Sequence, residues 1–208
     1  MNAIHHQYDR NNEGRDFVIG DLHGCYDELK DKLLDVNFNE EVDRVFSVGD
    51  LVDRGPESLE CLRLTKEPWF HAVMGNHEDM MFNVYCKKWN PRLWFMNGGM
   101  WSDSLTEAEQ IELKGLCDSL IATMPHMITV GKVGIIHAEP PYVWGATAYE
   151  ESMLWGRSLI GRSEPVYVSG VEKVYAGHTI VRKPSTLGNL NFIDTGCFAT
   201  GNLCIIQL

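Results

Sequence analysis

The 208-residue sequence lacks several features that would assign it to whole classes of protein. It has no apolar run of the roughly 18 residues that a transmembrane helix needs, and its first residues lack the apolar centre of a signal peptide. It has no internal repeat and no low-complexity tract. We therefore expect a single domain over residues 1–208, with a polar N-terminal tail at residues 1–15 that includes His5 and His6.

Positive charge is also scarce. Lys and Arg total 18 against 29 Asp and Glu, which gives a formal net charge of -11. An acidic surface repels nucleic-acid phosphates and anionic lipid, so we expect neither nucleic acid nor a membrane as a partner. An anionic substrate would need a local source of positive charge, and bound metal ions are the obvious source.

The six cysteines form no Cys-x-x-Cys pair and are irregularly spaced. A disulfide framework is typical of small secreted domains, so in this longer chain we expect reduced, mostly buried thiols and a cytoplasmic location. Cys25 is not followed by a Cys-x5-Arg phosphate loop. This argues against Cys25 as a catalytic nucleophile.

What the sequence does contain is a recurring pattern of short apolar runs, each followed by a small residue and polar side chains. Such runs are typical of buried strands, and in α/β proteins ligand-binding loops collect at strand ends. The runs and the motifs that follow them are 17–19 with GDLHG (20–24), 45–48 with GDLVDRG (49–55), 72–74 with GNHE (75–78), 133–136 with HAE (137–139), and 174–176 with GHT (177–179).

The remaining patterns predict a mixed α/β sandwich of layered sheets. Helices are expected at residues 26–36, from residue 58, and at 106–120, where Thr106 and Glu109 form a capping box. A hairpin is expected at 127–136, and closing strands at 192–194 and 203–206. We interpret residues 80–125 as a small helical insertion whose tryptophans serve packing rather than forming a substrate wall. His71 and His126 lie outside the motifs and are expected to pack or lie at the surface.

The side chains at the strand ends predict a metal centre. Carboxylate, imidazole and amide donors together suit Mn²⁺, Fe or Zn²⁺ better than Ca²⁺ or a structural zinc. Two metal ions about 3.5–4 Å apart need a shared carboxylate, and Asp50 is the natural bridge. The candidate ligands are Asp21, His23, Asp50, Asn76, His137 and His178.

Together, these five motifs resemble the signature of the PPP-type metallophosphatases, and in particular the small lambda-type phosphatases of bacteriophages and bacteria. The resemblance extends from Asp16 to Leu208. It implies a calcineurin-like fold, a β-sandwich flanked by helices with a small helical insertion. It also implies a bacterial cytoplasm, or a host cytoplasm for a phage protein. No regulatory subunit is implied, because the chain lacks the longer C-terminal region of the eukaryotic relatives.

The resemblance also implies a role for each matching residue. Asp21 and His23 would bind the first metal ion, Asp50 would bridge both, and Asn76, His137 and His178 would bind the second. His77 would be the general acid, oriented by Asp53. Arg54 and Arg157 would grip the phosphate, with Asn76 also in the substrate site. Two divalent ions are expected, Mn²⁺ first, with Fe, Zn or Ni as alternatives. Glu139 receives no role.

The function expected from this resemblance is metal-dependent hydrolysis of phosphoserine or phosphothreonine in a phosphoprotein or phosphopeptide, with phosphotyrosine left open. A metal-bridging hydroxide would attack phosphorus directly. Two alternatives remain. A symmetrical dinucleoside polyphosphate hydrolase shares the motifs, although the short chain leaves less surface for two nucleosides. A catalytically inactive phosphopeptide-binding module is disfavoured by the presence of His77, Asp53 and Arg54.

Overall fold

Two β-sheets form the centre of the molecule, and the computed structural model describes residues 5–119, 123–145 and 148–208. The larger sheet has the strand order β1-β5-β6-β7-β9-β8, and the smaller has the order β10-β2-β3-β4. The larger sheet consists of β1 (His5–Tyr8), β5 (Met127–Val130), β6 (Val133–Ile136), β7 (Lys173–Ala176), β8 (Ser185–Leu187) and β9 (Leu190–Phe192). The smaller consists of β2 (Asp16–Ile19), β3 (Arg44–Ser47), β4 (Phe70–Ala72) and β10 (Ile205–Gln207).

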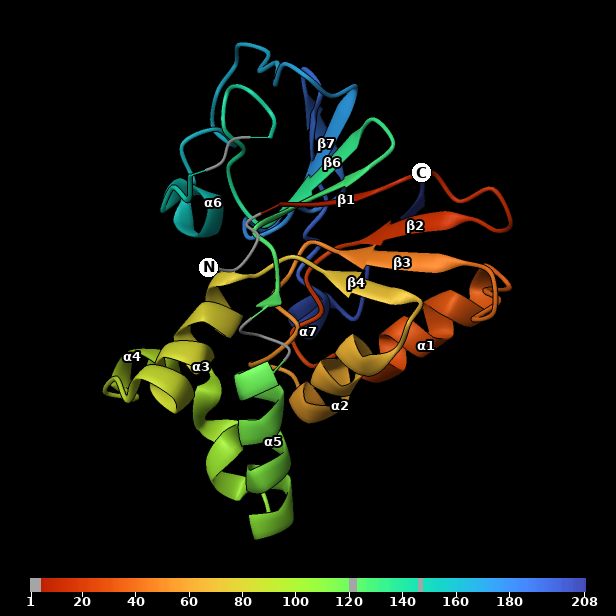
Figure 1. The fold of residues 1–208 in the computed structure, drawn as a ribbon. Helices are drawn as coiled ribbons and strands as arrows, with labels where there is room; N and C mark the ends of the chain where they lie inside the picture. Colours follow the sequence, from red (N-terminus) through yellow and green to blue (C-terminus); the bar gives the residue numbers. More distant parts are fainter. Residues whose placement is uncertain (1–4, 120–122, 146–147) are drawn as a thin grey trace.

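Apolar side chains fill the space between the sheets. Val18 and Phe46 from the smaller sheet share one buried cluster with Ile128 and Ile135 from the larger sheet. Because side chains alternate along a strand, Phe17 points to the opposite face. There it packs with α1 (Tyr26–Asp35) and α2 (Ser58–Arg63), which cover the outer face of the smaller sheet (Figure 1). The remaining short helices are η1 (Leu64–Lys66), α6 (Ser152–Trp155) and α7 (Cys197–Thr200). The predicted two-sheet α/β sandwich is confirmed.

The helical segment after β4 extends away from both sheets (Figure 1). It consists of α3 (Asn76–Lys87), α4 (Arg92–Met96), η2 (Gly99–Ser104) and α5 (Glu107–Ser119). Its first helix begins at Asn76, before the predicted boundary at residue 80. The capping box at α5 is present, because the Glu109 carboxylate accepts the Thr106 N–H at 2.8 Å and Thr106 Oγ1 accepts the Glu109 N–H at 3.4 Å. Residues 120–122, also within the predicted segment, lie outside the described residues.

Parallel strand pairing gathers the motif loops at one edge. β2, β3 and β4 are parallel to one another, and so are β6, β7 and β9. Each motif follows the carboxyl end of one of these strands, and ligand-binding loops collect at such ends. The predicted hairpin at 127–136 is confirmed as the antiparallel pair β5–β6.

The prediction of a polar tail over residues 1–15 is wrong for residues 5–8. They form β1, which pairs in parallel with β5 from His5–Met127 to Tyr8–Val130. His5 Nε2 lies 2.7 Å from Thr129 Oγ1, and the His5 ring meets Trp144 edge-on. Backbone hydrogen bonds hold this edge strand, so no apolar run was needed to form it. Residues 1–4 lie outside the described part of the chain.

Two further expectations concern packing and membrane insertion. His71 packs against Tyr8 and Phe46, and His126 packs against Tyr149, in line with the prediction that these histidines pack or lie at the surface. Within the described residues, no helix is long and apolar enough to cross a bilayer.

Candidate metal centre

Strained backbone conformations concentrate at the ends of the strands. Among the described residues, seven that are not glycine have positive φ, and five of these seven belong to the motifs. Such conformations cost about 1–3 kcal/mol each and persist where the surrounding structure enforces them, commonly at functional sites. The five are His23, Asp50, Asp53, Arg54 and His178, with φ between 44° and 73°.

Asp50 lies at the centre of the site. Its carboxylate belongs to two groups of potential metal ligands, one with His23 and His77 and the other with His137 and His178, and the ligand atoms of each group lie within 4.8 Å of one another. One carboxylate oxygen lies 3.4 Å from His23 Nε2, and the other lies 3.4 Å from His137 Nε2. Asp50 is therefore placed to share its two oxygens between two cations.

Two histidines of the site are fixed in one tautomer. His23 Nδ1 donates to the Val52 carbonyl at 2.8 Å, and His137 Nδ1 donates to the Val48 carbonyl at 2.8 Å. A carbonyl only accepts, so each Nδ1 carries the hydrogen and each Nε2 presents a lone pair toward Asp50. This backbone support is the usual arrangement behind a metal-binding imidazole.

The Asn76 side chain joins the second group. Its Oδ1 lies 2.9 Å from His137 Nε2 and 3.0 Å from His178 Nδ1, while the two ring nitrogens are 3.1 Å apart. His137 Nε2 and Asn76 Oδ1 are acceptors, so at most one hydrogen, on His178 Nδ1, can serve both of them. His178 Nε2 is buried without a partner among the described residues. A cation would satisfy three converging lone pairs, so these residues fit a metal ion.

Asp21 lies beside these groups but belongs to neither of them. Its carboxylate accepts the backbone N–H of His178 at 3.0 Å. Burial raises its pKa well above the usual value, and the neighbouring carboxylates of Asp194 and Asp50 raise it further. Burial also raises the pKa of Asp194 to about 6. Three carboxylates this close and this buried need positive charge among them in order to ionise together.

Asp194 was missed by sequence reasoning. It follows β9, whose parallel neighbour β7 leads to His178. The sequence offered one usable signal, an aspartate after an apolar run at the end of a strand, as in the GD motifs. Asp194 was instead assigned to the predicted strand itself.

The four histidines of the site differ in protonation. Burial lowers the pKa of His23 to about 3 and that of His178 to about 3, and it lowers the pKa of His137 as well. For His77, burial also acts to lower the pKa, but the charge of Asp50 and the bond to Asp53 outweigh it, so the pKa is raised. Three imidazoles are therefore neutral, as metal ligands must be, while His77 favours the protonated form that a general acid requires.

The Asp53 carboxylate is held by three N–H groups. His77 Nδ1 lies 2.6 Å from its Oδ2, and the indole nitrogens of Trp94 and Trp101 donate to it at 2.9 and 2.7 Å. Asp53 is completely buried, so these bonds fix both the carboxylate and the His77 ring. The interpretation of the tryptophans as packing alone is wrong for Trp94 and Trp101. Side-chain bonds between loops this far apart in the chain leave no sequence pattern.

Two arginines face this centre from its exposed side. Arg54 Nη1 lies 2.7 Å from His23 Nε2 and Nη2 lies 2.9 Å from His77 Nε2, so its guanidinium group lies against both imidazole rings. Arg157 is also exposed, and its charge acts to lower the pKa values of His137, His178 and Asp194. Two accessible guanidinium groups beside buried ligands provide a place for a phosphoryl anion.

Two glutamates hold the loops of the site in place. Glu78 accepts the N–H groups of Asp50, Leu51 and Gly75 at 2.8, 2.8 and 3.0 Å, which ties the loop after β3 to the start of α3. Glu139 accepts the Leu159 N–H at 2.6 Å and the Ser158 hydroxyl at 3.1 Å. Glu139 thereby anchors the turn that carries Arg157, although the sequence assigned it no role.

The fold and this ligand arrangement define a metallophosphoesterase. The family model for calcineurin-like phosphoesterases matches residues 17–182, and the chain belongs to this family.

Individual relatives differ in how much of the chain they match. The chain is 38% identical to serine/threonine-protein phosphatase 2 of Salmonella typhimurium, over 92% of each protein. It is 52% identical to the symmetrical bis(5'-nucleosyl)-tetraphosphatase of Actinobacillus pleuropneumoniae, but over only 30% of this chain and 24% of that enzyme. A protein serine/threonine phosphatase structure from Saccharomyces cerevisiae superposes with a TM-score of 0.70 at 15% identity, covering 99% of this chain and 76% of that one.

Proposed function

We propose that this protein is a metal-dependent phosphoprotein phosphatase that hydrolyses phosphoserine and phosphothreonine. The observation that carries the proposal is that Asp50 is shared between two groups of metal-type donors, one with His23 and the other with His137 and His178. Beside them lie the buried His77–Asp53 pair and the exposed Arg54. A single such group would also fit a structural metal. Two groups with a common carboxylate and an accessible cationic side are the arrangement that hydrolysis of a phosphate ester requires.

The residues fit a pair of divalent cations, with Mn²⁺ as the proposed ion. Asp21, His23 and Asp50 would hold one ion, and Asp50, Asn76, His137 and His178 would hold the other. When bound, such a pair supplies positive charge to phosphoryl oxygens and lowers the pKa of a water molecule toward 7. Because Arg54 contacts His23 Nε2, its guanidinium must turn outward when that nitrogen binds a cation.

The chain's own side chains account for phosphate binding and leaving-group departure. A phosphate bound between Arg54 and Arg157 would take up their N–H donors, Arg54 exchanging its imidazole contacts for phosphoryl oxygens. His77 Nε2, whose ring is fixed by Asp53 at Nδ1, would then deliver a proton to the departing seryl or threonyl oxygen. An alkoxide is a poor leaving group, so this proton accounts for about 10²–10⁴-fold in rate.

The coverage of the relatives favours a phosphoprotein over a dinucleoside polyphosphate. Sequence similarity to the tetraphosphatase of Actinobacillus pleuropneumoniae covers 30% of this chain, whereas sequence similarity to the phosphatase of Salmonella typhimurium covers 92% of it. We infer a cytoplasmic location, where phosphoproteins and reduced thiols coexist.

Direct comparison of substrates tests this function. With Mn²⁺ present, kcat/KM is measured for a phosphoserine peptide, a phosphotyrosine peptide, p-nitrophenyl phosphate and diadenosine tetraphosphate. We expect the phosphoserine peptide to exceed diadenosine tetraphosphate by at least about tenfold, a difference of about 1.4 kcal/mol in transition-state binding.

The His77→Asn variant tests the assignment of the general acid. It should lose about 10²–10⁴-fold in kcat on the phosphoserine peptide while retaining its metal. A preference for diadenosine tetraphosphate would replace the proposal with the dinucleoside alternative. Peptide binding without turnover in the Mn²⁺-loaded wild type would indicate the inactive binding module.

A further inference from the structure

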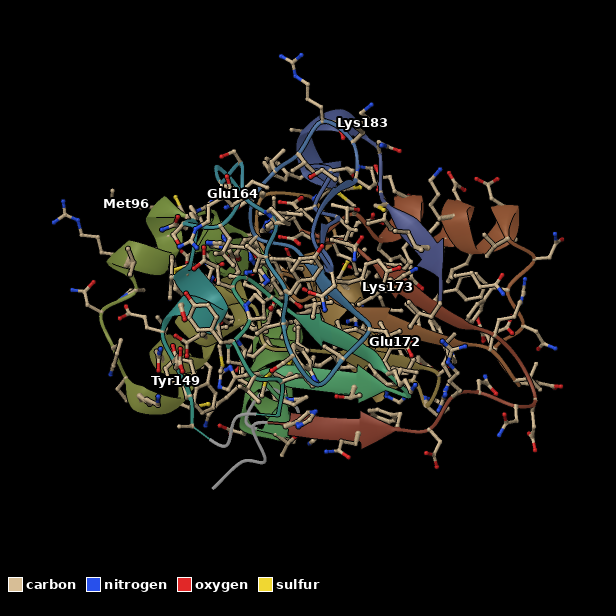
Figure 2. All side chains as sticks on the ribbon, turned by 90° about the horizontal axis from the view of Figure 1, so that it is seen from above. Met96, Tyr149, Glu164, Glu172, Lys173 and Lys183 are labelled. Atoms are coloured by element: carbon tan, nitrogen blue, oxygen red, sulfur yellow. The ribbon has the colours of Figure 1, made fainter. Side chains whose placement is uncertain are left out.

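A cavity of about 440 Å³ lies beside the metal centre. It is lined by α3, α4 and residues of the segment 149–155, and Figure 2 labels Tyr149 on the side of the molecule where these helices lie. Two of its lining residues also contact the centre: Trp94 donates to Asp53, and the Trp155 ring meets the His178 ring edge-on at 6.2 Å. A ligand in this cavity would therefore be adjacent to a phosphate bound at the centre.

The walls of the cavity are mainly aromatic and apolar. Trp89 is 60% exposed, Leu93 is 59% exposed and Trp155 is 37% exposed, although all three belong to one cavity. Clustered exposed side chains of this size mark binding sites more often than ordinary surface. Aromatic faces also attract cations through their negative π-surfaces.

The polar groups in the same walls include unpaired acceptors. Asp79 and Glu151 line the cavity, and neither forms an ion pair in the part of the chain that the structure describes. Asn83 is 5% exposed, and its Oδ1 is buried with no hydrogen-bond partner among the described residues. Its Nδ2 donates to Asp79 Oδ2 at 3.0 Å, which leaves the oxygen as the unsatisfied atom. A buried acceptor without a donor is costly, so this wall favours a ligand that brings N–H groups.

The two carboxylates act on the same part of the cavity. Burial raises the pKa of the Tyr149 phenol, and the charges of Asp79 and Glu151 raise it further, which places both carboxylates near that ring. Burial likewise raises the pKa of Asp79, and the charge of Lys87 and the hydrogen bond from Asn83 offset this effect only in part. A cation between them would relieve this penalty.

We propose that this cavity binds the guanidinium or ammonium side chain of a basic residue that lies close in sequence to the phosphorylated residue of the substrate. The proposal rests on the proposed phosphoprotein phosphatase function and names the class of peptide that it selects. An arginine supplies five N–H donors and no acceptor, which matches the carboxylates and the Asn83 oxygen. Its aliphatic stem and its planar head suit the apolar and aromatic walls.

An adenine base is the competing occupant, and it fits less well. Stacking on Trp89 or Trp155 would be available to it, but adenine offers a single amino group as donor and several ring nitrogens that require donors in return. The polyphosphate attached to it would also lie near the carboxylates of Asp79 and Glu151. Charge therefore favours a peptide cation over a nucleotide.

The test compares phosphoserine peptides that differ at one flanking position, which contains arginine, citrulline or glutamate and is scanned on both sides of the phosphoserine. Citrulline keeps the shape of arginine and removes its charge. At the position that reaches the cavity, we expect kcat/KM for the arginine peptide to exceed that of the citrulline peptide about tenfold, mainly through KM. The Asp79→Asn, Glu151→Gln double variant should reduce this ratio to near one.

The ratio between two peptides on one variant cancels any general loss of activity or folding. Glu164→Gln removes an exposed carboxylate that does not line the cavity and should retain the wild-type ratio. If arginine and citrulline peptides are hydrolysed equally at every position, the cavity proposal is wrong while the phosphatase function stands. If no phosphopeptide is hydrolysed, the proposed function itself fails. A rise in KM for diadenosine tetraphosphate in Trp155→Ala, with no arginine preference, would assign the cavity to a nucleobase.

Discussion

The orientation of His77 depends on Asp53, and Asp53 depends in turn on two tryptophans. Asp53 is buried and would be costly as an unpaired charge, and the N–H groups of Trp94 and Trp101 help to satisfy it. These tryptophans therefore act on the reaction through Asp53 and are positioning residues. Hydrogen bonds between residues 41 and 48 positions apart in the chain thus help to hold the proton donor at one angle.

Trp101→Phe tests this role. The substitution keeps an aromatic ring and removes the N–H that donates to Asp53 at 2.7 Å. We expect kcat on a phosphoserine peptide to fall about three- to tenfold, because the His77–Asp53 pair loses part of its support. The loss on p-nitrophenyl phosphate should be smaller, since nitrophenolate needs little protonation to leave. Stopped assays of the two substrates on one preparation give the ratio.

Trp144→Phe is the matched control. It loses an indole N–H bond of the same length, 2.7 Å, to Thr129, on the outer part of the larger sheet. That variant should retain the wild-type ratio between the two substrates. Equal losses on both substrates in Trp101→Phe would reduce its role to packing.

The sequence predicted those residues of the site that belong to a short motif next to a strand. Each of them lies within a few residues of the end of an apolar run, so the strand end and the motif can be recognised in one short stretch of sequence. These residues are Asp21, His23, Asp50, Asn76, His137 and His178. Asp194 and the two tryptophans were not predictable in this way. Their contribution depends on which loops meet in space, and a single sequence does not record that.

Among the elements, the buried central strands were easier to predict than the edge strand β1. Runs such as Phe17-Val18-Ile19 are buried on both faces, so composition alone identifies them. β1 was missed because its residues, His5 to Tyr8, are polar and half-exposed, and the pairing with β5 is made by backbone groups. Edge strands are governed by their neighbours more than by their own composition.

One ion pair joins the starts of β2 and β3. Asp43, with a side chain that is 3% exposed, accepts from the backbone N–H of Arg15 at 2.7 Å and from that of Asn39 at 3.0 Å, and it pairs with the Arg15 guanidinium. Burial acts to raise the pKa of Asp43, but the bonds from Arg15 and Asn39 outweigh it and lower the pKa below the usual value. The carboxylate therefore stabilises the fold in its ionised form.

The Asp43→Asn variant should be less stable by about 1–2 kcal/mol near pH 7. A group whose pKa is lowered by folding contributes stability above its unfolded pKa, about 3.9, and this contribution is lost as the pH falls through the lower folded value. The difference from wild type should thus be constant from pH 5 to 7 and shrink below about pH 4. Urea denaturation with chelator present, at each pH, measures it.

Glu172→Gln is the control for the Asp43→Asn variant. It breaks an ion pair with Lys132 in which both side chains are more than half exposed, 60% and 73%, so the change should stay within about 0.5 kcal/mol. A stability difference for Asp43→Asn that persists unchanged at pH 3 would mean that shape, rather than charge, matters at this position.

Across the whole molecule, the centre joins the two sheets. Asp50 follows β3 of the smaller sheet, whereas His137 and His178 follow β6 and β7 of the larger. The architecture was predictable because each apolar run implied a strand and the motifs implied a common edge. The pairing of β1 was not, nor was the position of Asp194 beside Asp21 and Asp50, because both depend on the assembled sandwich.

Because the ligands of the centre come from both sheets, metal binding should stabilise the entire fold. Ions held by ligands from both sheets bind the folded chain and not the unfolded one, so stability rises with metal concentration by about 2.7 kcal/mol for each ion at one hundred times its Kd. For a chain of this size, that corresponds to roughly 5–10 °C in Tm. Differential scanning calorimetry of chelated protein, titrated with Mn²⁺, should show such a rise.

In Asp50→Asn, both groups of ligands lose their shared carboxylate, so most of the rise in Tm should disappear, while Glu164→Gln should keep it. If Tm were independent of Mn²⁺, or if Asp50→Asn responded like wild type, the two sheets would not be linked through shared metal ions.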